Sequence, residues 1–407
     1  MRRTLPRVLI GQALASLASF ATVLALGRWG GESQLGLFSL GMSAQFLALS
    51  LTDTLIATPY TYQRAQPERL AGDLVMAAAW GVLALALAFG AVLTVLTVLM
   101  PTDVFGLATL WPALPLALAA AALREFRRRH LLVDGAAAAL LRLDASGAVV
   151  QIAGLALLVF TQQLSARSAL VWMTLAAALP LLPLLGRARL QRLLAARPVA
   201  TAVVRHFVHY GHWLLLGGLC HVASVQAYPW LAFAAGGTGL AGRFAAANAL
   251  LNLMSPLLTG LTNHYRPLLM EARVQLSARD FTVRVLSSLP VFVLPALGLW
   301  LALALAGKLA LSCLYGSALA SAAVALPWLG LGLLAVALGA PLQLGLLALG
   351  APATNLAYHG TALLTLVLAA ALAGPLQLEP LSMTFAGANL LATAVLGALF
   401  FARSRSG

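Results

Sequence analysis

Ten polar side chains that could bind a solute or an ion stand inside apolar stretches of this 407-residue sequence. These residues are Gln12, Gln45, Asp53, Arg142, Asp144, Gln151, His221, Gln226, Asn248 and Asn252. Amides and imidazoles hydrogen-bond neutral solutes, whereas carboxylates hold protons or cations. Because polar groups within a membrane segment usually face the interior of the helix bundle, we expect these side chains to line a substrate cavity.

Asp53 needs a polar partner, because placing a charged group in lipid costs free energy. Its carboxylate must find water, a proton, a cation or an internal salt bridge, and a purely structural role is the alternative. Arg142 and Asp144 are two residues apart, so they point to different sides of a helix and are not expected to pair. Either of them can instead reach the inner membrane surface. His221 either lines the cavity or makes a structural hydrogen bond.

Arginines stand at the ends of several apolar stretches, at Arg28, Arg243 and Arg266. A guanidinium in such a place either contacts a phosphate at the rim of a cleft or anchors the helix at the membrane interface. The same two interpretations apply to the basic run 127–129, for which a solvated or lipid-facing anchor is preferred. The three arginines at helix ends are therefore candidates for phosphate contact.

Motifs for catalysis or nucleotide binding are missing from the sequence. The segment 237–242 matches GxGxxG in letters, but a span of membrane type precedes it and no βαβ unit surrounds it. A tight outer turn, in which glycine permits a positive φ, is the better interpretation. There is no phosphate-binding GK[ST] loop and no HExxH motif. The sequence therefore predicts neither an enzyme nor a cofactor.

Metal binding is not expected either. His206 and His209 share one face of a helix, but His212 rotates away from His206, so these are interpreted as interfacial histidines near lipid phosphate. Cys220 and Cys313 fall within or beside apolar spans and form no CxxC pair. We expect both to be free, buried thiols.

The composition places the chain in a lipid bilayer. Hydrophobic residues make up 61% of it and charged residues 9%, with a mean hydropathy of +0.94. A membrane helix needs about 20 apolar residues, and the sequence supplies twelve such stretches. They are 6–28, 36–60, 71–100, 105–123, 136–160, 166–186, 210–234, 240–264, 285–306, 318–348, 351–373 and 381–402. The fold class is therefore an all-α integral membrane protein with twelve transmembrane helices.

The net charge of +14 follows the membrane topology rather than a nucleic-acid partner. With both termini cytoplasmic and twelve crossings, most of the 25 lysines and arginines fall on cytoplasmic segments, as the positive-inside rule requires. Anionic membrane lipids are the expected partners of this charge. The first apolar stretch is too long for the core of a signal peptide, so we expect an uncleaved first helix.

Two halves of the chain are similar. A shift of 206 residues places Gly30 and Gly31 on Gly236 and Gly237, and it places Gly36 on Gly242. Internal duplication of apolar helices is typical of secondary transporters, in which the substrate pathway lies between the repeats. The expected domains are a six-helix lobe over 1–186, an amphipathic cytoplasmic linker over 187–207 and a second six-helix lobe over 208–407.

The pattern resembles a known family. The turn Arg28-Trp-Gly-Gly-Glu-Ser-Gln-Leu-Gly36, the continuation Gly36-Leu-Phe-Ser-Leu, the segment Ala241-Gly-Arg-Phe-Ala-Ala-Ala-Asn248 and the pair Tyr315-Gly316 carry the resemblance. They look like the polysaccharide-repeat (O-antigen type) flippases of the multidrug/oligosaccharidyl-lipid/polysaccharide exporter superfamily. The likeness extends over nearly the whole chain, although its motifs are diffuse.

The resemblance implies a V-shaped pair of lobes with alternating access in the bacterial inner membrane. The implied substrate is a polyprenyl-diphosphate-linked oligosaccharide, with other glycan-assembly membrane proteins as partners. Relatives often hold several cations deep in the cavity, whereas here the deep residues are mostly amides. The alternative is a cation-coupled multidrug or metabolite antiporter, with a proton or sodium as the coupling ion. A membrane-embedded glycan polymerase or transferase would need a large outer loop with catalytic charges, which the sequence does not supply.

Overall fold

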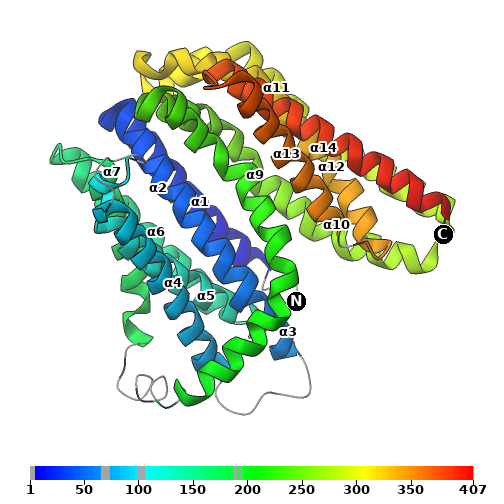
Figure 1. Cartoon of the computed structure of the whole chain (residues 1–407), viewed down its shortest axis with the longest axis horizontal. Coiled ribbons are helices and arrows are strands. Elements are labelled where there is room, and N and C mark those ends of the chain that lie inside the picture. The colour runs from blue at the N-terminus through cyan, green and yellow to red at the C-terminus, as the bar shows by residue number, and fades with distance from the viewer. Residues whose placement is uncertain are drawn as a thin grey trace. The chain divides into compact units, whose positions relative to one another are not determined.

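The computed structural model describes residues 5–65, 74–99, 106–184, 186, 191, 195, 197–351 and 353–406. Within these ranges the chain is almost entirely helical and has no strands. Nine helices in the described ranges are long and apolar enough to cross a membrane. The expected fold class, an all-α integral membrane protein, is confirmed (Figure 1).

The count of nine and the expected twelve differ for identifiable reasons. Two of the nine, Pro6–Arg64 and Leu215–Gln275, each contain two of the apolar stretches seen in the sequence. Helix α5 (Ala113–Val133) covers most of the stretch 105–123, but five charged residues in its second half keep it out of the nine. The number of crossings and the cytoplasmic termini stay predictions.

Contacts between Cα atoms divide the chain into two compact units. Unit 1 comprises Met1–Gly30 and Leu37–Val222, and unit 2 comprises Gly31–Gly36 and Ala223–Gly407. The division therefore falls inside one long helix, α9 (Arg197–Leu251), rather than at the predicted linker 187–207. Within that linker, residues 187–190, 192–194 and 196 lie outside the described residues, and 197–207 open α9 with Pro198 in its first turn.

Unit 1 contains the first helices of the chain. Its elements are α1 (Leu5–Ala25), η1 (Leu26–Gly30), most of α2 (Gly31–Thr52), η2 (Asp53–Ala57), α3 (Thr58–Ala65), α4 (Leu74–Leu99), η3 (Ala108–Leu110), α5, α6 (Ala137–Phe160), α7 (Ala166–Ala178), η4 (Leu179–Leu184) and the start of α9. Helix α1 packs along α6, and α5 packs against both α4 and α7. Small residues allow close approach. A Cβ at Gly154 of α6 would stand 2.2 Å from the ring of Trp172 in α7.

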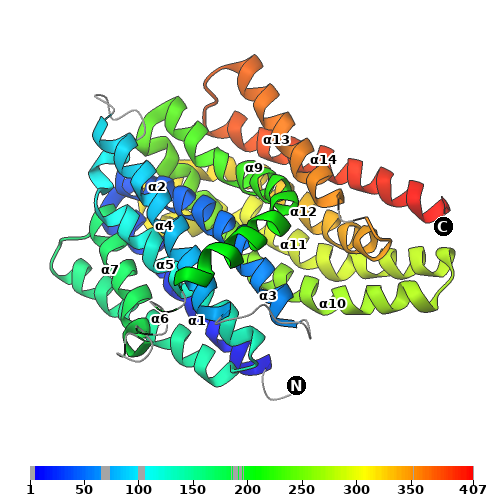
Figure 2. The ribbon, with the colours of Figure 1, turned by 60° about the horizontal axis from the view of Figure 1, so that its bottom comes forward.

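Unit 2 contains the remaining helices. They are the rest of α9, η5 (Asn252–Met254), α10 (Ser255–Gln275), α11 (Ala278–Tyr315), η6 (Ser317–Ala325), α12 (Leu326–Ala348), α13 (Thr354–Ala373) and α14 (Leu378–Ser406). Helix α12 packs against α11 and α14, and α13 lies beside α14 (Figure 2). Phe281, Phe292, Tyr358 and Phe400 belong to one buried cluster that joins these helices.

Glycines at equivalent positions of the repeat adopt the same unusual backbone. Gly31 has a φ of 82°, and Gly237, which lies 206 residues later, has a φ of 65°. At Gly236 and Gly237 the backbone leaves the helical conformation, so α9 is two helices joined at a kink. The tight glycine turn expected at 237 is confirmed. Gly316 after Tyr315 also has a positive φ, of 85°.

A second equivalent pair, Gly36 and Gly242, packs backbone against backbone in unit 2. A Cβ on Gly36 would stand 1.8 Å from the carbonyl oxygen of Thr238, and one on Gly242 would stand 1.9 Å from that of Glu32. Neither position has room for a side chain. The first residues of α2 therefore lie directly on the part of α9 that follows the kink.

Candidate functional site

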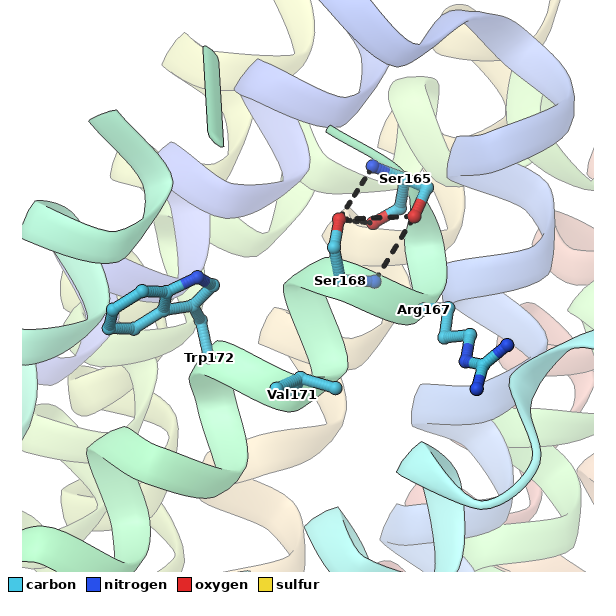
Figure 3. Close-up of a pocket in the computed structure, with 5 residues that line it drawn as sticks. All are labelled: Ser165, Arg167, Ser168, Val171 and Trp172. Atoms are coloured by element: carbon cyan, nitrogen blue, oxygen red, sulfur yellow. Dashed lines mark hydrogen bonds between the residues drawn. The ribbon is translucent and has the colours of Figure 1, made fainter. Parts of the chain in front are cut away.

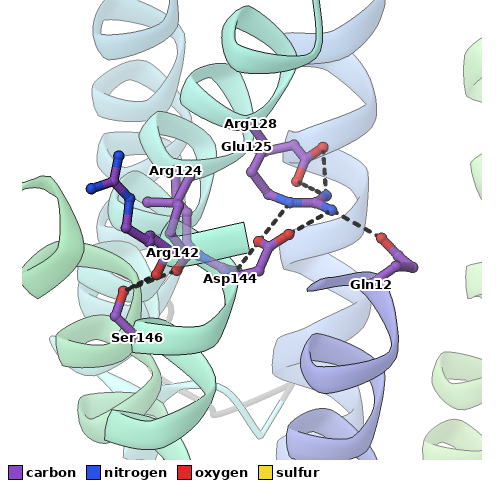
Figure 4. A network of polar contacts seen from close by, with 8 residues as sticks. Gln12, Arg124, Glu125, Arg128, Arg142, Asp144 and Ser146 are labelled. Carbon is purple, nitrogen blue, oxygen red and sulfur yellow. Dashed lines mark hydrogen bonds and ion pairs between the residues drawn. The ribbon is translucent and has the colours of Figure 1, made fainter. Parts of the chain in front are cut away.

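A buried carboxylate in unit 1 holds two arginines. Asp144 of α6 has no solvent exposure, and its Oδ1 accepts hydrogen bonds from Arg128 Nε at 2.9 Å and Arg124 Nη2 at 3.1 Å (Figure 4). Arg128 Nη2 also donates to Asp144 Oδ2 at 3.3 Å. Paired contacts of this kind combine charge with fixed geometry. They join α5 to α6.

The same network reaches the first helix. Arg128 Nη2 donates to Gln12 Oε1 at 2.9 Å, and its Nη1 donates to Glu125 Oε2 at 3.1 Å. Helix α1 comes this close because residue 11 is a glycine, at which an added Cβ would stand 2.9 Å from Asp144 Oδ2. Two of the residues expected in the cavity, Gln12 and Asp144, thus accept hydrogen bonds from the same arginine, Arg128.

Arg124 is the less satisfied member of the network. Its Nε is buried without a hydrogen-bond partner among the described residues. Burial lowers the pKa of this guanidinium, and the negative charge of Asp144 opposes the shift. A guanidinium nevertheless stays protonated in proteins, so Asp144 faces two full positive charges.

Asp53 also pairs with an arginine. It opens η2, a single wide turn that follows α2, and its Oδ1 accepts from Arg129 Nη2, while Thr58 Oγ1 donates to Oδ2 at 3.3 Å. Both partners of the pair are partly exposed, Arg129 to 37% and Asp53 to 40%. Of the roles open to Asp53, the internal salt bridge is the one present in the structure.

The basic run 127–129 differs from the expected topological anchor at two of its three positions. Arg128 and Arg129 bind carboxylates of neighbouring helices instead of only solvent or lipid heads. The physical reason is that α6 and η2 present acidic side chains to this end of α5. Arg124 and Arg128, which complete the site around Asp144, were not among the expected cavity residues.

A further polar chain extends from the same end of α5. Tyr60 and His130 are joined by a hydrogen bond of 2.8 Å between the phenol and Nδ1. Asp134 lies 3.5 Å from His130 Nε2 and 3.3 Å from Arg64 Nη2. These contacts tie α3 to α5. The sequence analysis did not single them out, because the partners are 70 residues apart along the chain.

Two glutamines in unit 1 differ in how well they are satisfied. Gln151 of α6 donates to Thr22 Oγ1 at 2.9 Å and to the carbonyl of Ala18 at 3.4 Å, so it ties α6 to α1. Gln45 of α2 is only 5% exposed, and its Oε1 has no hydrogen-bond partner among the described residues. Gln45 is therefore a buried amide with unused hydrogen-bonding capacity.

The remaining expected cavity residues lie in different surroundings. Arg142 is exposed and its side chain points away from Asp144, as expected from their spacing (Figure 4). His221 is exposed on unit 1 and Asn252 on unit 2. Gln226 and Asn248 are half-buried within unit 2. Their place in a substrate cavity stays a prediction.

The three arginines proposed for the cleft rims have different surroundings. Arg28 is exposed and its guanidinium stands 5.9 Å from the centre of the Trp29 ring. Arg243 donates from Nε to Glu32 Oε2 at 2.9 Å within unit 2. Arg266 of α10 is exposed. A phosphate at Arg243 would have to compete with Glu32.

Unit 2 has its own polar contacts, which the sequence analysis missed. Ser224 Oγ and His359 Nδ1 are 3.0 Å apart, and Gln343 donates to Asn355 at 2.7 Å. Tyr358 donates to Asn389 Oδ1 at 2.8 Å. The signal was present, since these polar residues interrupt the apolar stretches 318–348, 351–373 and 381–402. The ten candidate cavity residues all lie before residue 253.

A surface depression of about 260 Å³ lies at the start of α7 (Figure 3). Its lining consists of Ser165, Arg167, Ser168, Val171 and Trp172. The two serines cap the helix by bonding each other's backbone N–H groups, and their hydroxyl oxygens are 3.0 Å apart. Their hydrogen-bonding capacity is thus spent on the helix end rather than on a ligand.

Metal ligands are not gathered in the described part of the chain, where no group of three His, Cys, Asp or Glu residues could hold an ion. The side chains of His206, His209 and His212 lie outside the described residues. Neither Cys220 nor Cys313 forms a disulfide. The expected burial of Cys313 is wrong, because this residue is exposed on the surface of α11.

Comparison with known proteins shows which solved structures have a similar fold. No family model and no curated protein matches the sequence. A multidrug resistance MATE family transporter of the MOP superfamily, in an inward-facing conformation, matches with a TM-score of 0.76 over 98% of both chains at 14% identity. A MOP superfamily transporter from Pyrococcus furiosus gives 0.64 at 15% identity, covering 98% of this chain and 94% of its own. The transporter VcmN from Vibrio cholerae gives 0.61 at 16% identity, covering 100% and 96%.

These likenesses show that the chain has the fold of the MATE transporters in the MOP superfamily. The superfamily that the sequence resembles is thereby supported at the level of fold. The polysaccharide-repeat branch is a finer assignment, which the likenesses do not reach.

Proposed function

We propose that the protein is an alternating-access transporter that moves polyprenyl-diphosphate-linked oligosaccharide across the bacterial inner membrane. The fold is that of membrane transporters. Alternating access is proposed to involve the halves 1–186 and 208–407. Catalysis forms no part of the proposal, because the described contacts are ion pairs and hydrogen bonds that position helices.

The observation that carries the choice of an anionic cargo is the pairing of Asp53 and Asp144 with arginines. Asp144 is fully buried and already binds two guanidiniums, so it has little capacity left for a sodium ion or a cationic drug. Asp53 is paired with Arg129. A transporter that exports cations would favour carboxylates without such partners. The exposed guanidiniums of Arg28 and Arg266 would favour a diphosphate instead.

One solved structure with the same fold supports the view that this fold can carry different cargoes. The work on the Pyrococcus furiosus transporter reports a binding pocket of reverse polarity and a suggested difference in function. The MOP fold is thus compatible with more than one polarity of pocket. In the present chain, amides such as Gln45 and Asn252 would bind sugar hydroxyls, and Arg28 and Arg266 would meet the diphosphate at the cleft rims.

Deletion of the gene tests the proposal in cells. Lipid-linked repeat units are expected to accumulate on the cytoplasmic face, because their passage to the outer leaflet would stop. Re-expression of the intact chain should restore surface glycan. Unchanged lipid pools together with unchanged surface glycan would contradict the proposal. Glycosyltransferase genes beside this one would support a role among glycan-assembly membrane proteins.

The second candidate function is a cation-coupled multidrug or metabolite antiporter. It is favoured by the multidrug resistance role of the neighbour with a TM-score of 0.76 and by the 40% exposure of Asp53, which would let a cation displace Arg129. Asp53→Asn should then abolish proton- or sodium-dependent efflux from vesicles. Asp134→Asn is the matched control, since Asp134 is also paired with an arginine and is 34% exposed. Flux that is equal in both variants and the parent would exclude this candidate.

A further inference from the structure

One face of α10 carries a row of polar side chains that the other helices of unit 2 leave uncovered. Ser255, Thr259, Asn263 and Arg266 follow one another at intervals of four, four and three residues, so they lie on the same side of the helix. Asn252, in the short turn η5 before α10, stands three residues ahead of Ser255. All five residues are exposed, and we call them the α10 stripe.

The opposite side of α10 holds the helix in unit 2. Leu269 is buried there. Leu258, Leu261 and Tyr265 pack against the buried cluster that contains Phe292. Contacts with α11 and α12 are thus made by apolar side chains. Helix α10 is therefore amphipathic, and its polar side is turned away from the core of unit 2.

Neighbouring helices of unit 2 present apolar side chains to the outside. Leu294 and Leu305 of α11 are 62% and 86% exposed, and Leu364 of α13 is 59% exposed. Such faces suit the acyl chains of lipid. The first four residues of the α10 stripe also stand within an apolar stretch, 240–264, yet they present amides and hydroxyls. Because polar groups in a membrane segment face water or a bound solute, acyl chains are a poor match for this face.

The hydrogen-bonding groups of the α10 stripe are unused. None of its five side chains makes a hydrogen bond or an ion pair with the described part of the chain. By contrast, Thr365 of α13 donates from Oγ1 to the carbonyl of Thr361 at 2.9 Å, so its hydroxyl serves its own helix. A Cβ added at Gly260, next to Thr259, would meet nothing within 4 Å. The face therefore offers free donors and acceptors together with open space.

The groups along the α10 stripe change from neutral to positive. Its first four members are amides and hydroxyls, which can hydrogen-bond the hydroxyls of a sugar. Arg266 follows about 16 Å from Ser255, at about 1.5 Å per residue, and a guanidinium suits a phosphate. The one carboxylate of α10, that of Glu271, accepts from Gln275 at 3.1 Å. Helix α10 thus offers a cationic solute no carboxylate without a partner.

We propose that the α10 stripe is the glycan-binding face of the transport pathway. Its four neutral side chains bond sugar hydroxyls, and Arg266 bonds the diphosphate that links the sugars to the lipid. The sugars then lie toward η5 and the diphosphate toward the later turns of α10. This inference rests on the proposed cargo and names the helix face that recognises it. Ser255, Thr259 and Asn263 are thereby added to the candidate binding residues.

The first experiment needs no substrate and measures whether the stripe meets water. Single cysteines replace Thr259 or Asn263 in a chain whose Cys220 and Cys313 are changed to alanine. The intact protein in lipid nanodiscs is treated with a water-soluble methanethiosulfonate reagent. Thr259→Cys and Asn263→Cys should react about tenfold faster than Leu305→Cys, because the reactive thiolate forms in water and not among acyl chains. Equal rates at all three positions would overturn the proposal.

The second experiment separates recognition of sugar from recognition of phosphate. The probes are a fluorescent short-chain prenyl-diphosphate disaccharide and the same prenyl diphosphate without sugar, titrated against the intact protein in nanodiscs. Thr259→Val and Asn263→Leu each remove hydrogen-bonding groups and should raise the Kd for the disaccharide about fivefold. Neither change should alter the Kd for the sugar-free probe. Arg266→Gln should weaken the binding of both probes.

A matched control makes the same change outside the stripe. Thr365→Val on α13 removes a hydroxyl that is already bonded to Thr361, so its affinity for both probes should equal that of the parent. If the parent binds the disaccharide and Thr259→Val and Asn263→Leu bind it equally well, the α10 stripe is overturned and the proposed function stands.

The behaviour of the parent distinguishes failure of the cargo from failure of the stripe. A parent that binds neither probe, although the stripe cysteines react quickly, would overturn the proposed cargo and with it the assignment of the stripe to sugars. Protection of Asn263→Cys from labelling by the disaccharide probe would support the proposal. Protection by a cationic dye instead would overturn it in favour of the second candidate function.

Discussion

Arg128 Nε lies 2.9 Å from Asp144 Oδ1, and this contact joins α5 to α6 at a carboxylate with no solvent exposure. A buried ion pair recovers the cost of dehydration only when its geometry is good and its other hydrogen bonds are satisfied. Here Arg128 also binds Gln12 and Glu125, which supplies those bonds. The pair therefore fixes how three helices meet.

Removing the central carboxylate should destabilise unit 1. In Asp144→Ala, Arg124 and Arg128 would keep their charges without the buried partner, at a cost of about 3 to 5 kcal/mol. Thermal unfolding in detergent should show a large drop in midpoint. Glu125→Gln is the control, because Glu125 is 44% exposed and such a pair contributes about 1 kcal/mol or less. Equal midpoints for the two variants would contradict this account of the network.

The partly exposed pair of Asp53 and Arg129 should behave as a reversible contact between η2 and α5. Each single charge reversal, Asp53→Arg or Arg129→Asp, places like charges together and should reduce transport. The double variant restores an opposite pair and should recover part of the lost flux. A double variant no better than the worse single one would mean that the pair has no direct coupling.

The glycine contact between α2 and α9 should tolerate no side chain. Gly242→Ala would place a Cβ 1.9 Å from the carbonyl oxygen of Glu32, so the helices must move apart and the folded protein should lose stability. Gly260→Ala is the matched control, since open space surrounds that helical glycine and alanine favours a helix by about 1 kcal/mol. Thermal unfolding should therefore shift in opposite directions for the two variants.

Gln45, which is buried, and Gln151, which is half-buried, should respond differently to loss of the amide. Gln151→Leu removes the bond to Thr22, leaves that hydroxyl its bond to Ala18, and should cost about 1 kcal/mol. Gln45→Leu removes an amide oxygen that has no partner and should be neutral or stabilising. If Gln45 binds the sugar as proposed, Gln45→Leu should nevertheless lower transport. Unfolding midpoints and flux, measured on the same preparations, test the expected changes in stability and in transport.

The helices were predictable because their apolar stretches are long and continuous. The turn at Gly237 was predictable because glycines recur at the equivalent repeat positions. The partners of Asp144 were not, since Arg124 and Arg128 stand 20 and 16 residues away on another helix. Which carboxylate such an arginine meets depends on how α5 and α6 pack, and periodicity does not specify that. The exposure of Cys313 was missed for the same reason, because a sequence does not show which face of an apolar helix is covered.

The backbone passes between the two compact units at three places, after Gly30, after Gly36 and after Val222. At the last two places the peptide chain continues as uninterrupted helix. At the first place the chain instead turns at Gly31, which has a positive φ. Gly31, with its φ of 82°, has a backbone that β-branched residues rarely adopt, so such a replacement would strain the start of α2.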